Sequence, residues 1–276
     1  MTRIAVLQMT AGIDPAGNAA SLTQACRDAA DGGAAMLFTP EMSGLLDRDR
    51  ARAIQVIRSE ADDPVLASVR EAAAEAGIWV AIGSLALRGE GERWVNRALI
   101  IDPQGQIRAR YDKMHMFDVD LATGESWRES NAYAPGHRAV TVDDTPVGRL
   151  GLTVCYDIRF PALFDALGRA LCDVIAIPAA FTVPTGKAHW HVLQRARAIE
   201  ASAYVVAAAQ VGAHADGRQT YGHSLVIDPW GEVLLDMGGE EAGIGFAEID
   251  PTRIAEVRRQ VPSLANRREI HDERSS

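Results

Sequence analysis

Two short stretches, "GAAMLFTPE" at residues 33–41 and "CDVIAIPAAF" at residues 172–181, follow one pattern. Each has small residues, then an apolar run of strand length, then a proline. Continuous apolar runs of this length are typical of strands that are covered on both faces of a sheet. Because one stretch lies in each half of the chain, the pattern indicates an internal duplication.

Further strand-length runs surround each stretch, and amphipathic helical segments separate them. The turn "PQG" at residues 103–105 predicts a hairpin, so some neighbouring strands must be antiparallel. The predicted class is therefore α/β with mixed sheets, covered by helices. The predicted strands are 3–9, 34–41, 78–84, 94–102, 106–113, 148–155, 173–181, 204–210, 221–228, 232–237 and 243–250, and the predicted helices begin near residues 18, 63, 161 and 188.

Length and composition favour one domain over residues 1–276, with the last few residues as a tail. The net charge of −9 predicts no attraction to nucleic acid, and no apolar run is long enough for a membrane span. The number of cysteines, 3, is odd, and they show no paired spacing, which predicts free thiols in the reducing cytoplasm.

The segment "MHMFDVDLATGESWRESNAYAPG" at residues 114–136 shows no helical or strand period. Long segments of this kind inside compact domains are usually lids or binding loops. We therefore expect these residues to border a ligand site.

Glu41, Lys113 and Cys155 each follow directly on a predicted strand, where ligand crevices of α/β sheets lie. Taken singly, each has a plainer explanation: Cys155 as a buried space-filler, Glu41 as a charge at a helix start, and Lys113 as a solvated strand end. Their complementary chemistry favours a joint site. Cys26 and Cys172 have no such neighbours, and we interpret both as structural.

Together these three groups predict acyl transfer through a thioester. Glu41, its pKa raised by burial, would take the proton of the Cys155 thiol and return it to a leaving amine. Lys113 and the backbone N–H of Tyr156 would hold the oxyanion.

Signatures of other enzyme classes are absent from the sequence. It contains no glycine-rich nucleotide or phosphate loop and no G-x-S-x-G elbow. His189 and His191 are two residues apart on a predicted helix, where side chains diverge, so that pair predicts no metal site. We expect no cofactor and no metal.

The chain resembles the nitrilase superfamily of carbon–nitrogen hydrolases. The family's Glu-Lys-Cys triad matches "FTPEMSG" at Glu41, "YDKMHMFDVD" at Lys113 and "GLTVCYDIRFP" at Cys155, in the same order. Its additional active-site glutamate falls on Glu129 in "RESNAYAPG", with Glu125 as the alternative. The likeness runs from "IAVLQMT" to "RRQVPSLANRR".

This resemblance implies a four-layer αββα sandwich with two mixed β-sheets. It also implies a homodimer or higher homo-oligomer, formed through helices beside the active site. The implied reaction proceeds through a Cys155 thioester, releases a carboxylic acid and ammonia, and needs no cofactor.

The second half is similar to the Nit branch, in "RARAIE" and in "YGHSLVIDPWG". That resemblance implies a small-molecule amide substrate bearing a carboxylate, and deaminated glutathione is the favoured one. Tyr156, Arg159, Phe181 and Thr182 are the expected substrate-binding residues. For Arg159, an internal ion pair with Asp157 is an equal alternative to substrate contact. Lys187 is a further candidate for contact with a distal substrate carboxylate, although a solvated loop lysine is the more usual case.

Other functions stay open. Within enzymes they are an omega-amidase acting on alpha-ketoglutaramate, an N-carbamoyl amine amidohydrolase and, less favoured, a nitrile hydrolase. Outside enzymes they are a catalytically silent interaction module and a redox-sensing thiol.

Overall fold

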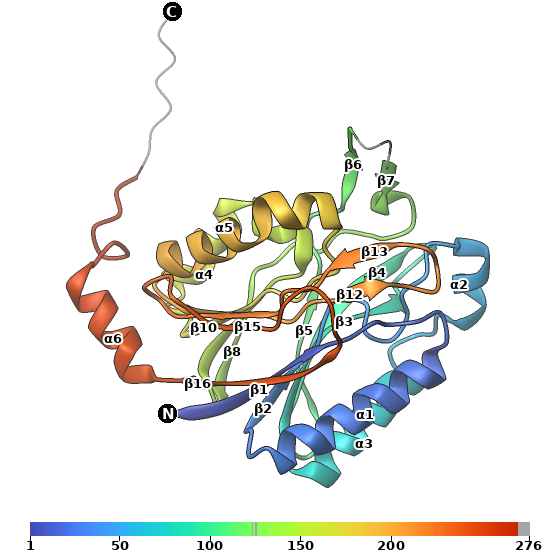
Figure 1. Cartoon of the computed structure of the whole chain (residues 1–276), viewed down its shortest axis with the longest axis horizontal. Coiled ribbons are helices and arrows are strands. Elements are labelled where there is room, and N and C mark those ends of the chain that lie inside the picture. Colours follow the sequence, from blue (N-terminus) through green and yellow to red (C-terminus); the bar gives the residue numbers. More distant parts are fainter. Residues whose placement is uncertain (123, 125, 270–276) are drawn as a thin grey trace, which may run out of the picture.

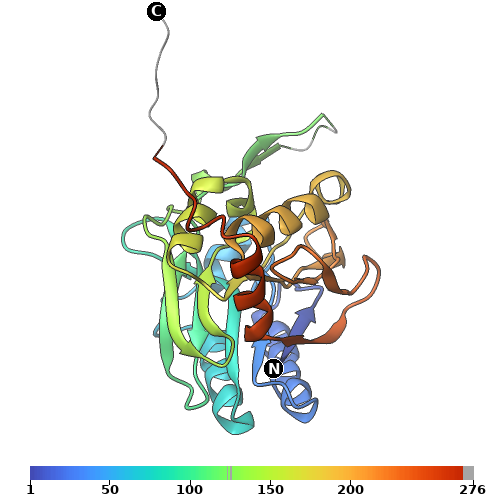
Figure 2. The same cartoon turned by 90° about the vertical axis from the view of Figure 1, so that its left-hand side faces the viewer.

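Four layers, helix–sheet–sheet–helix, make up the computed structural model of the chain (Figures 1 and 2). It describes residues 1–269 apart from Thr123 and Glu125, so the expected tail and the alternative glutamate at residue 125 lie outside the described residues. The predicted α/β class and the two mixed sheets are confirmed.

The first sheet has six strands in the order β16-β1-β2-β3-β4-β5. Strands β1, β2 and β3 are parallel, and β4, β5 and β16 run antiparallel to their neighbours. The bounds are β1 Thr2–Gln8, β2 Met36–Phe38, β3 Trp79–Arg88, β4 Trp94–Ile101, β5 Ile107–Asp112 and β16 Gly243–Ile249.

The second sheet repeats this plan in the order β8-β9-β10-β11-β14-β15. Again three parallel strands, β9, β10 and β11, have one antiparallel neighbour on one side and two on the other. Strands β2 and β10, which carry the two repeated stretches, hold the same place in their sheets, as the duplication predicts. The bounds are β8 Val140–Thr145, β9 Gly148–Leu152, β10 Val174–Ala176, β11 Tyr204–Ala207, β14 Leu225–Ile227 and β15 Val233–Asp236.

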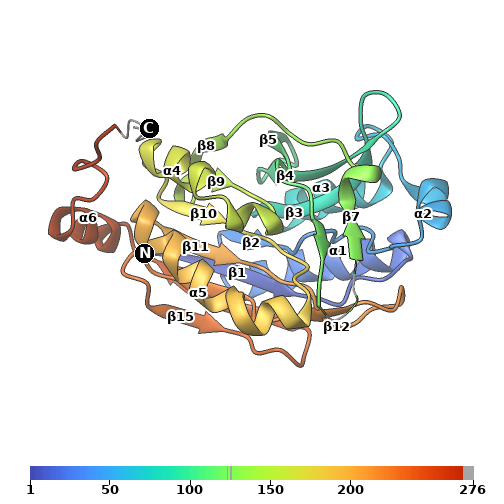
Figure 3. The same cartoon turned by 90° about the horizontal axis from the view of Figure 1, so that it is seen from above.

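Helices cover the outer face of each sheet. Helices α1 (Pro15–Asp31) and α3 (Pro64–Ala76) lie on the first sheet, and α4 (Pro161–Arg169) and α5 (Val183–Ala201) lie on the second (Figures 1 and 3). Asp14 and Asp63 start the first two helices by accepting hydrogen bonds from backbone N–H groups of the first turn. A proline at the first helical position follows each of these caps.

Alternation along β1 shows how the layers share the core. Ile4 and Val6 belong to the cluster between the two sheets, whereas Ala5 and Leu7 pack with α1 and α3. Successive side chains of a strand point to opposite faces, so both faces of β1 must be apolar. This explains the continuous apolar runs in the sequence.

The remaining elements were not predicted from the sequence. Two two-stranded hairpins pair β6 with β7 and β12 with β13, and the first of them stands out from the body above α5 (Figure 1). None of the helices among the described residues is long and apolar enough to cross a bilayer. The bounds are α2 Arg50–Val56, α6 Pro251–Gln260, β6 Asp118–Asp120, β7 Ser126–Arg128, β12 Val211–Ala213 and β13 Gln219–Tyr221, with 3₁₀ turns η1 Glu129–Asn131 and η2 Cys155–Arg159.

Candidate active site

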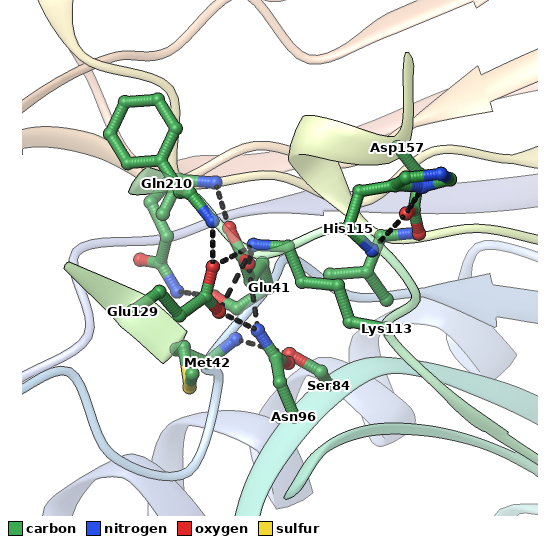
Figure 4. Close-up of polar contacts among 12 residues, drawn as sticks. Glu41, Met42, Ser84, Asn96, Lys113, His115, Glu129, Asp157 and Gln210 are labelled. Carbon is green, nitrogen blue, oxygen red and sulfur yellow. Dashed lines mark hydrogen bonds and ion pairs between the residues drawn. The ribbon is translucent and has the colours of Figure 1, made fainter. Parts of the chain in front are cut away.

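Glu41 lies in a tight loop that follows β2 and is clamped by β3. Gly83 donates a backbone hydrogen bond to the Thr39 hydroxyl, and the Ser84 hydroxyl accepts one from the backbone N–H of Met42 at 2.9 Å. Met42 has φ +57°, so the chain turns sharply just after the glutamate. The backbone carbonyl of Glu41 accepts a 2.9 Å hydrogen bond from Gln210 (Figure 4). The loop thus fixes the direction of the Glu41 side chain.

Lys113, directly after β5 as predicted, is only 2% exposed. Its Nζ lies 2.9 Å from Glu41 Oε1 and 2.9 Å from Glu129 Oε2 (Figure 4). Burial lowers the pKa of Lys113, but the negative charges of Glu129 and Glu41 and the hydrogen bond to Glu129 outweigh this and hold the pKa well above its ordinary value. The ammonium is therefore charged.

Glu129 begins the turn η1, at the foot of the β6–β7 hairpin. Its Oε2 accepts a 2.7 Å hydrogen bond from the backbone N–H of Phe117. The amide nitrogen of Asn96, from β4, donates to both Glu41 Oε1 at 2.9 Å and Glu129 Oε1 at 3.2 Å. Segment 114–136 therefore carries a short hairpin and a carboxylate over the site, where a lid or binding loop was expected.

Cys155 does not end a strand, which corrects the prediction. Strand β9 stops at Leu152, and Cys155 opens the 3₁₀ turn η2 with φ +50°. Because the carboxylate of Asp157 caps this turn by accepting from the backbone N–H of Val154, the chain cannot continue as a strand.

Asp157 is fully buried and has further partners behind the turn. It accepts hydrogen bonds from the Tyr111 hydroxyl at 2.7 Å and from the His115 backbone N–H at 3.0 Å. The His115 ring also contacts it and stacks on Phe160. Asp157 is thus engaged by other groups and forms no ion pair with Arg159.

The pKa values of the Cys155 thiol and the Glu41 carboxylate are shifted in opposite directions. Burial raises the pKa of Cys155, the charge of Glu41 raises it further, and Lys113 only partly opposes them, so the thiol is protonated at rest. For Glu41, burial raises the pKa, but the Lys113 charge and hydrogen bonds from Lys113, Cys155 and Asn96 outweigh it and lower the pKa. The expected raised pKa of Glu41 is therefore wrong, because that expectation considered burial without these donors.

These residues open on a cavity of about 710 Å³. Glu41, Lys113, Glu129 and Cys155 all line it, so the structure brings the four predicted catalytic side chains together. The predicted substrate-binding residues Tyr156, Phe181 and Thr182 line it as well.

Two predicted cations do not reach the cavity. The Arg159 guanidinium lies over the rings of Tyr156 and Phe181, at 5.7 and 5.3 Å from their centres, and is not among the lining residues. Lys187 is exposed on α5 and does not line the cavity either. The substrate contact predicted for Arg159 therefore stays a prediction, and the exposed position of Lys187 fits its solvated alternative.

Sequence reasoning missed several lining or supporting residues. Asn96 sits in the middle of an ordinary apolar strand pattern, and only its polar character in "WVNRALI" could have marked it. Arg48 and Tyr133 line the cavity from two loops, and Trp127 lines it from β7. No motif connects them, because they meet only in the folded chain.

The other thiols lie apart from this site. Cys26 and Cys172 are free and buried, and burial raises the pKa of each to about 12. Neither lines the cavity. Both therefore fit the structural role expected for them.

Comparisons with known proteins agree with this geometry. The carbon-nitrogen hydrolase family matches residues 3–259. The chain is 40% identical over 268 residues to the deaminated glutathione amidase of Yersinia enterocolitica, covering 96% of this chain and 92% of that protein. Against the human deaminated glutathione amidase the identity is 37% over 269 residues, covering 96% of this chain and 82% of the relative.

Among solved structures, the nitrilase and fragile histidine triad fusion protein NitFhit of Caenorhabditis elegans superposes with a TM-score of 0.90 at 37% identity, covering 97% of this chain and 65% of that one. An amidase from Nesterenkonia sp. AN1, solved with acrylamide added to its active-site cysteine, gives a TM-score of 0.79 at 25% identity, covering 95% and 98%. The fold, the buried thiol and these relatives agree. The chain belongs to the carbon–nitrogen hydrolase family and is a hydrolase of carbon–nitrogen bonds other than peptide bonds.

Proposed function

We propose that this protein hydrolyses the amide of a small carboxylated substrate, deaminated glutathione, through a thioester on Cys155. The observation that carries this proposal is the cluster of Glu41, Lys113 and Glu129 around a buried thiol at the floor of one cavity. The name of the Yersinia and human relatives supports the choice of substrate.

In the proposed first half-reaction Glu41 is the general base. It is ionised and hydrogen-bonded to the Cys155 thiol, so it takes that proton as the sulfur attacks the amide carbonyl. The C–N bond then breaks, and the same proton passes to the leaving amine. In the second half-reaction Glu41 removes a proton from water as the water attacks the thioester. The C–S bond then breaks, the acid is freed, and the proton passes from Glu41 to the Cys155 sulfur.

The oxyanion of each tetrahedral intermediate needs donors near the sulfur. The Lys113 ammonium is one, since its charge interacts with the thiol. The backbone N–H of Tyr156 is the other: the first helical hydrogen bond of η2 comes from Asp157, one residue later, so the turn does not use the N–H of Tyr156. Glu129 positions Lys113 through their ion pair and helps to keep the Lys113 ammonium protonated.

A carboxylated substrate also needs a cation in the cavity wall. Four arginines line the cavity, and Arg50, Arg128 and Arg218 are each hydrogen-bonded or ion-paired to other protein groups. The Arg48 guanidinium has no hydrogen bond or ion pair to any described residue. We therefore assign to Arg48 the carboxylate contact first expected of Arg159.

A second polar group in the wall supports the same assignment. The indole N–H of Trp127 is buried in the cavity wall and has no hydrogen-bond partner among the described residues. A buried donor without a partner costs free energy, which a bound substrate oxygen would recover. Arg48 and Trp127 together favour a substrate that is rich in oxygen acceptors.

The leaving group follows from the chemistry of the substrate and corrects the expected release of ammonia. Deaminated glutathione has an oxo group in place of its amino group, and both of its amides are secondary. Hydrolysis of the amide next to the 2-oxo acid part gives 2-oxoglutarate and the free amine of cysteinylglycine. Alpha-ketoglutaramate, by contrast, is a primary amide and releases 2-oxoglutarate and ammonia.

This difference makes the experiment direct. We would measure kcat/KM on deaminated glutathione, alpha-ketoglutaramate and an N-carbamoyl amine, following 2-oxoglutarate, cysteinylglycine and ammonia separately. We expect a preference for deaminated glutathione on the order of tenfold or more, and no turnover by Cys155→Ala. A preference for alpha-ketoglutaramate with ammonia release would instead identify an omega-amidase.

Two other results would overturn parts of the proposal. Wild-type rates in Cys155→Ala would remove the thioester mechanism. Failure of all three substrates, together with no labelling of Cys155 by an electrophilic amide analogue, would favour the silent interaction module.

We also propose that the protein acts in the cytoplasm. All three cysteines are free and buried, which fits a reducing compartment. Cell fractionation with an antibody against the chain tests this, and recovery outside the cytoplasmic fraction would contradict it.

A further inference from the structure

Three side chains with metal-binding atoms meet away from the active-site cavity: His191, His223 and Asp236. They come from α5, from the loop between β13 and β14, and from the end of β15. His191 Nε2 lies 3.0 Å from one carboxylate oxygen of Asp236, and His223 Nδ1 lies 2.8 Å from the other. All the donor atoms lie within 4.8 Å of one another, and none of the three residues lines the cavity.

His223 is held rigidly by its surroundings. Its backbone has φ +54°, its N–H donates to the Gly238 carbonyl at 2.7 Å, and its carbonyl accepts from the buried Trp190 indole at 2.7 Å. Its ring stacks on Tyr221 with ring centres 4.4 Å apart. The imidazole is therefore oriented toward Asp236 before any ligand arrives.

Asp236 is oriented and charged in a way that suits a cation. One of its oxygens accepts a 2.9 Å hydrogen bond from the backbone N–H of Gly238. The side chains of His191 and Asp236 are about one-third exposed and that of His223 is 25% exposed, so an ion can enter from solvent.

We propose that His191, His223 and Asp236 form a Zn²⁺ site. Two imidazole nitrogens and a carboxylate are a ligand set that zinc accepts, with water in the fourth position and bonds of about 2.0–2.1 Å. Each imidazole would present the lone pair of the nitrogen that now faces Asp236 and carry its proton on the other ring nitrogen. Small side-chain rotations bring the donors from their present spacing to a tetrahedron.

The site would join three separate segments of the fold. Zinc would tie α5, on the outer face of the second sheet, to the loop after β13 and to the end of β15, which is an edge strand of that sheet. A ligand that binds only the folded chain raises its stability. Because the three residues lie outside the cavity, the site is structural and independent of the amide reaction.

Binding is tested on the full chain with Cys155→Ala as the background, since a thiol is itself a zinc ligand. Metal-free protein is titrated with Zn²⁺ by calorimetry, and Co²⁺ absorbance reports the coordination geometry. We expect one Zn²⁺ per chain, an intense tetrahedral Co²⁺ spectrum and a higher thermal midpoint with zinc. In His191→Ala and Asp236→Ala the affinity should fall on the order of tenfold or more.

His189→Ala is the matched control, because His189 lies on the same helix, is exposed and is not part of the cluster. It should bind zinc as the background does. Absence of binding, or equal binding in His191→Ala, Asp236→Ala and the background, would overturn the proposal and leave the three residues as a hydrogen-bonded cluster only.

Discussion

Cys155 and Glu41 share one buried environment, yet their pKa values move in opposite directions from their ordinary values. Lys113 lowers the pKa of the Cys155 thiol, but burial and the charge of Glu41 raise it more. The Glu41 carboxylate, in contrast, accepts hydrogen bonds from several donors, which lower its pKa. The resting pair is therefore a neutral thiol and an ionised carboxylate. This is the protonation state that a nucleophile and its base need at the start of a cycle.

Asn96 is the neutral donor that helps to keep Glu41 ionised. In Asn96→Leu, which keeps the shape and removes the donor, the pKa of Glu41 rises. In the proposed mechanism activity needs ionised Glu41 and is lost as the pH falls through that pKa, so the acid limb of kcat/KM should move to higher pH. At a fixed pH on the acid limb we expect kcat/KM to fall about ten- to hundredfold, from a hydrogen bond to a charged group of ~1.5–3 kcal/mol, and to change little on the plateau near neutral pH.

The pH profile of the wild-type protein, the Leu variant and the exposed control Asn266→Leu is the measurement. The control should match the wild type. An unmoved acid limb in Asn96→Leu would show that Asn96 does not tune Glu41.

Arg48 is expected to contribute to binding more than to chemistry. In Arg48→Ala, KM for a carboxylated amide should rise about tenfold or more, from loss of a charge-assisted hydrogen bond, while kcat changes little. Lys187→Ala, which removes an exposed cation outside the cavity, is the control. Steady-state kinetics at low and high salt measure both, and an unchanged KM in Arg48→Ala would exclude this contact.

Among the elements, β3 does most to place Glu41. A methyl group on Gly83 would collide with the backbone carbonyl of Thr39 and with Pro178. The strand register also shifts between Ile82 and Leu85, beside this close approach. The bulge therefore lets two backbones meet where only glycine fits.

Gly83→Ala should consequently displace the Glu41 loop. We expect the free energy of unfolding to fall by about 1–3 kcal/mol, as for an overpacked site, and kcat to fall with it. Gly243→Ala is the control, because a methyl group there meets nothing within 4 Å. Urea unfolding and kcat are measured for both, and wild-type values in Gly83→Ala would contradict the clamp.

For the whole molecule, the two equivalent sheets place the reactive groups at one end of the sandwich. Glu41 follows β2 and Lys113 follows β5 in the first sheet, and Cys155 follows β9 in the second. The site therefore requires both sheets to pack on their shared core. Loss of that packing would remove the thiol from its base.

We propose that the chain assembles as a homodimer or higher homo-oligomer through α5. Val192 and Ile199 are 68% and 50% exposed. They are seven residues apart and therefore lie on one face of α5, where they form an apolar stripe that a second copy of the helix can cover. Val192→Glu should therefore lower the mass measured by light scattering to that of the 29.7 kDa monomer. Ile54→Glu, on α2, should not change the mass, and a monomeric wild-type protein would contradict the proposal.

The sequence by itself determined the α/β class, indicated the internal duplication, and predicted roles for Glu41, Lys113 and Cys155 from their chemistry and for Glu129 from the family resemblance. Apolar periodicity reports which faces are buried, and the spacing of the motifs carried the resemblance. The tertiary structure alone decided that Cys155 opens a turn, that Glu41 is ionised rather than protonated, and that Arg48 rather than Arg159 faces the cavity. Turns, pKa values and cavity walls depend on contacts between segments distant in sequence, such as Asn96 with Glu41. No local pattern encodes those contacts.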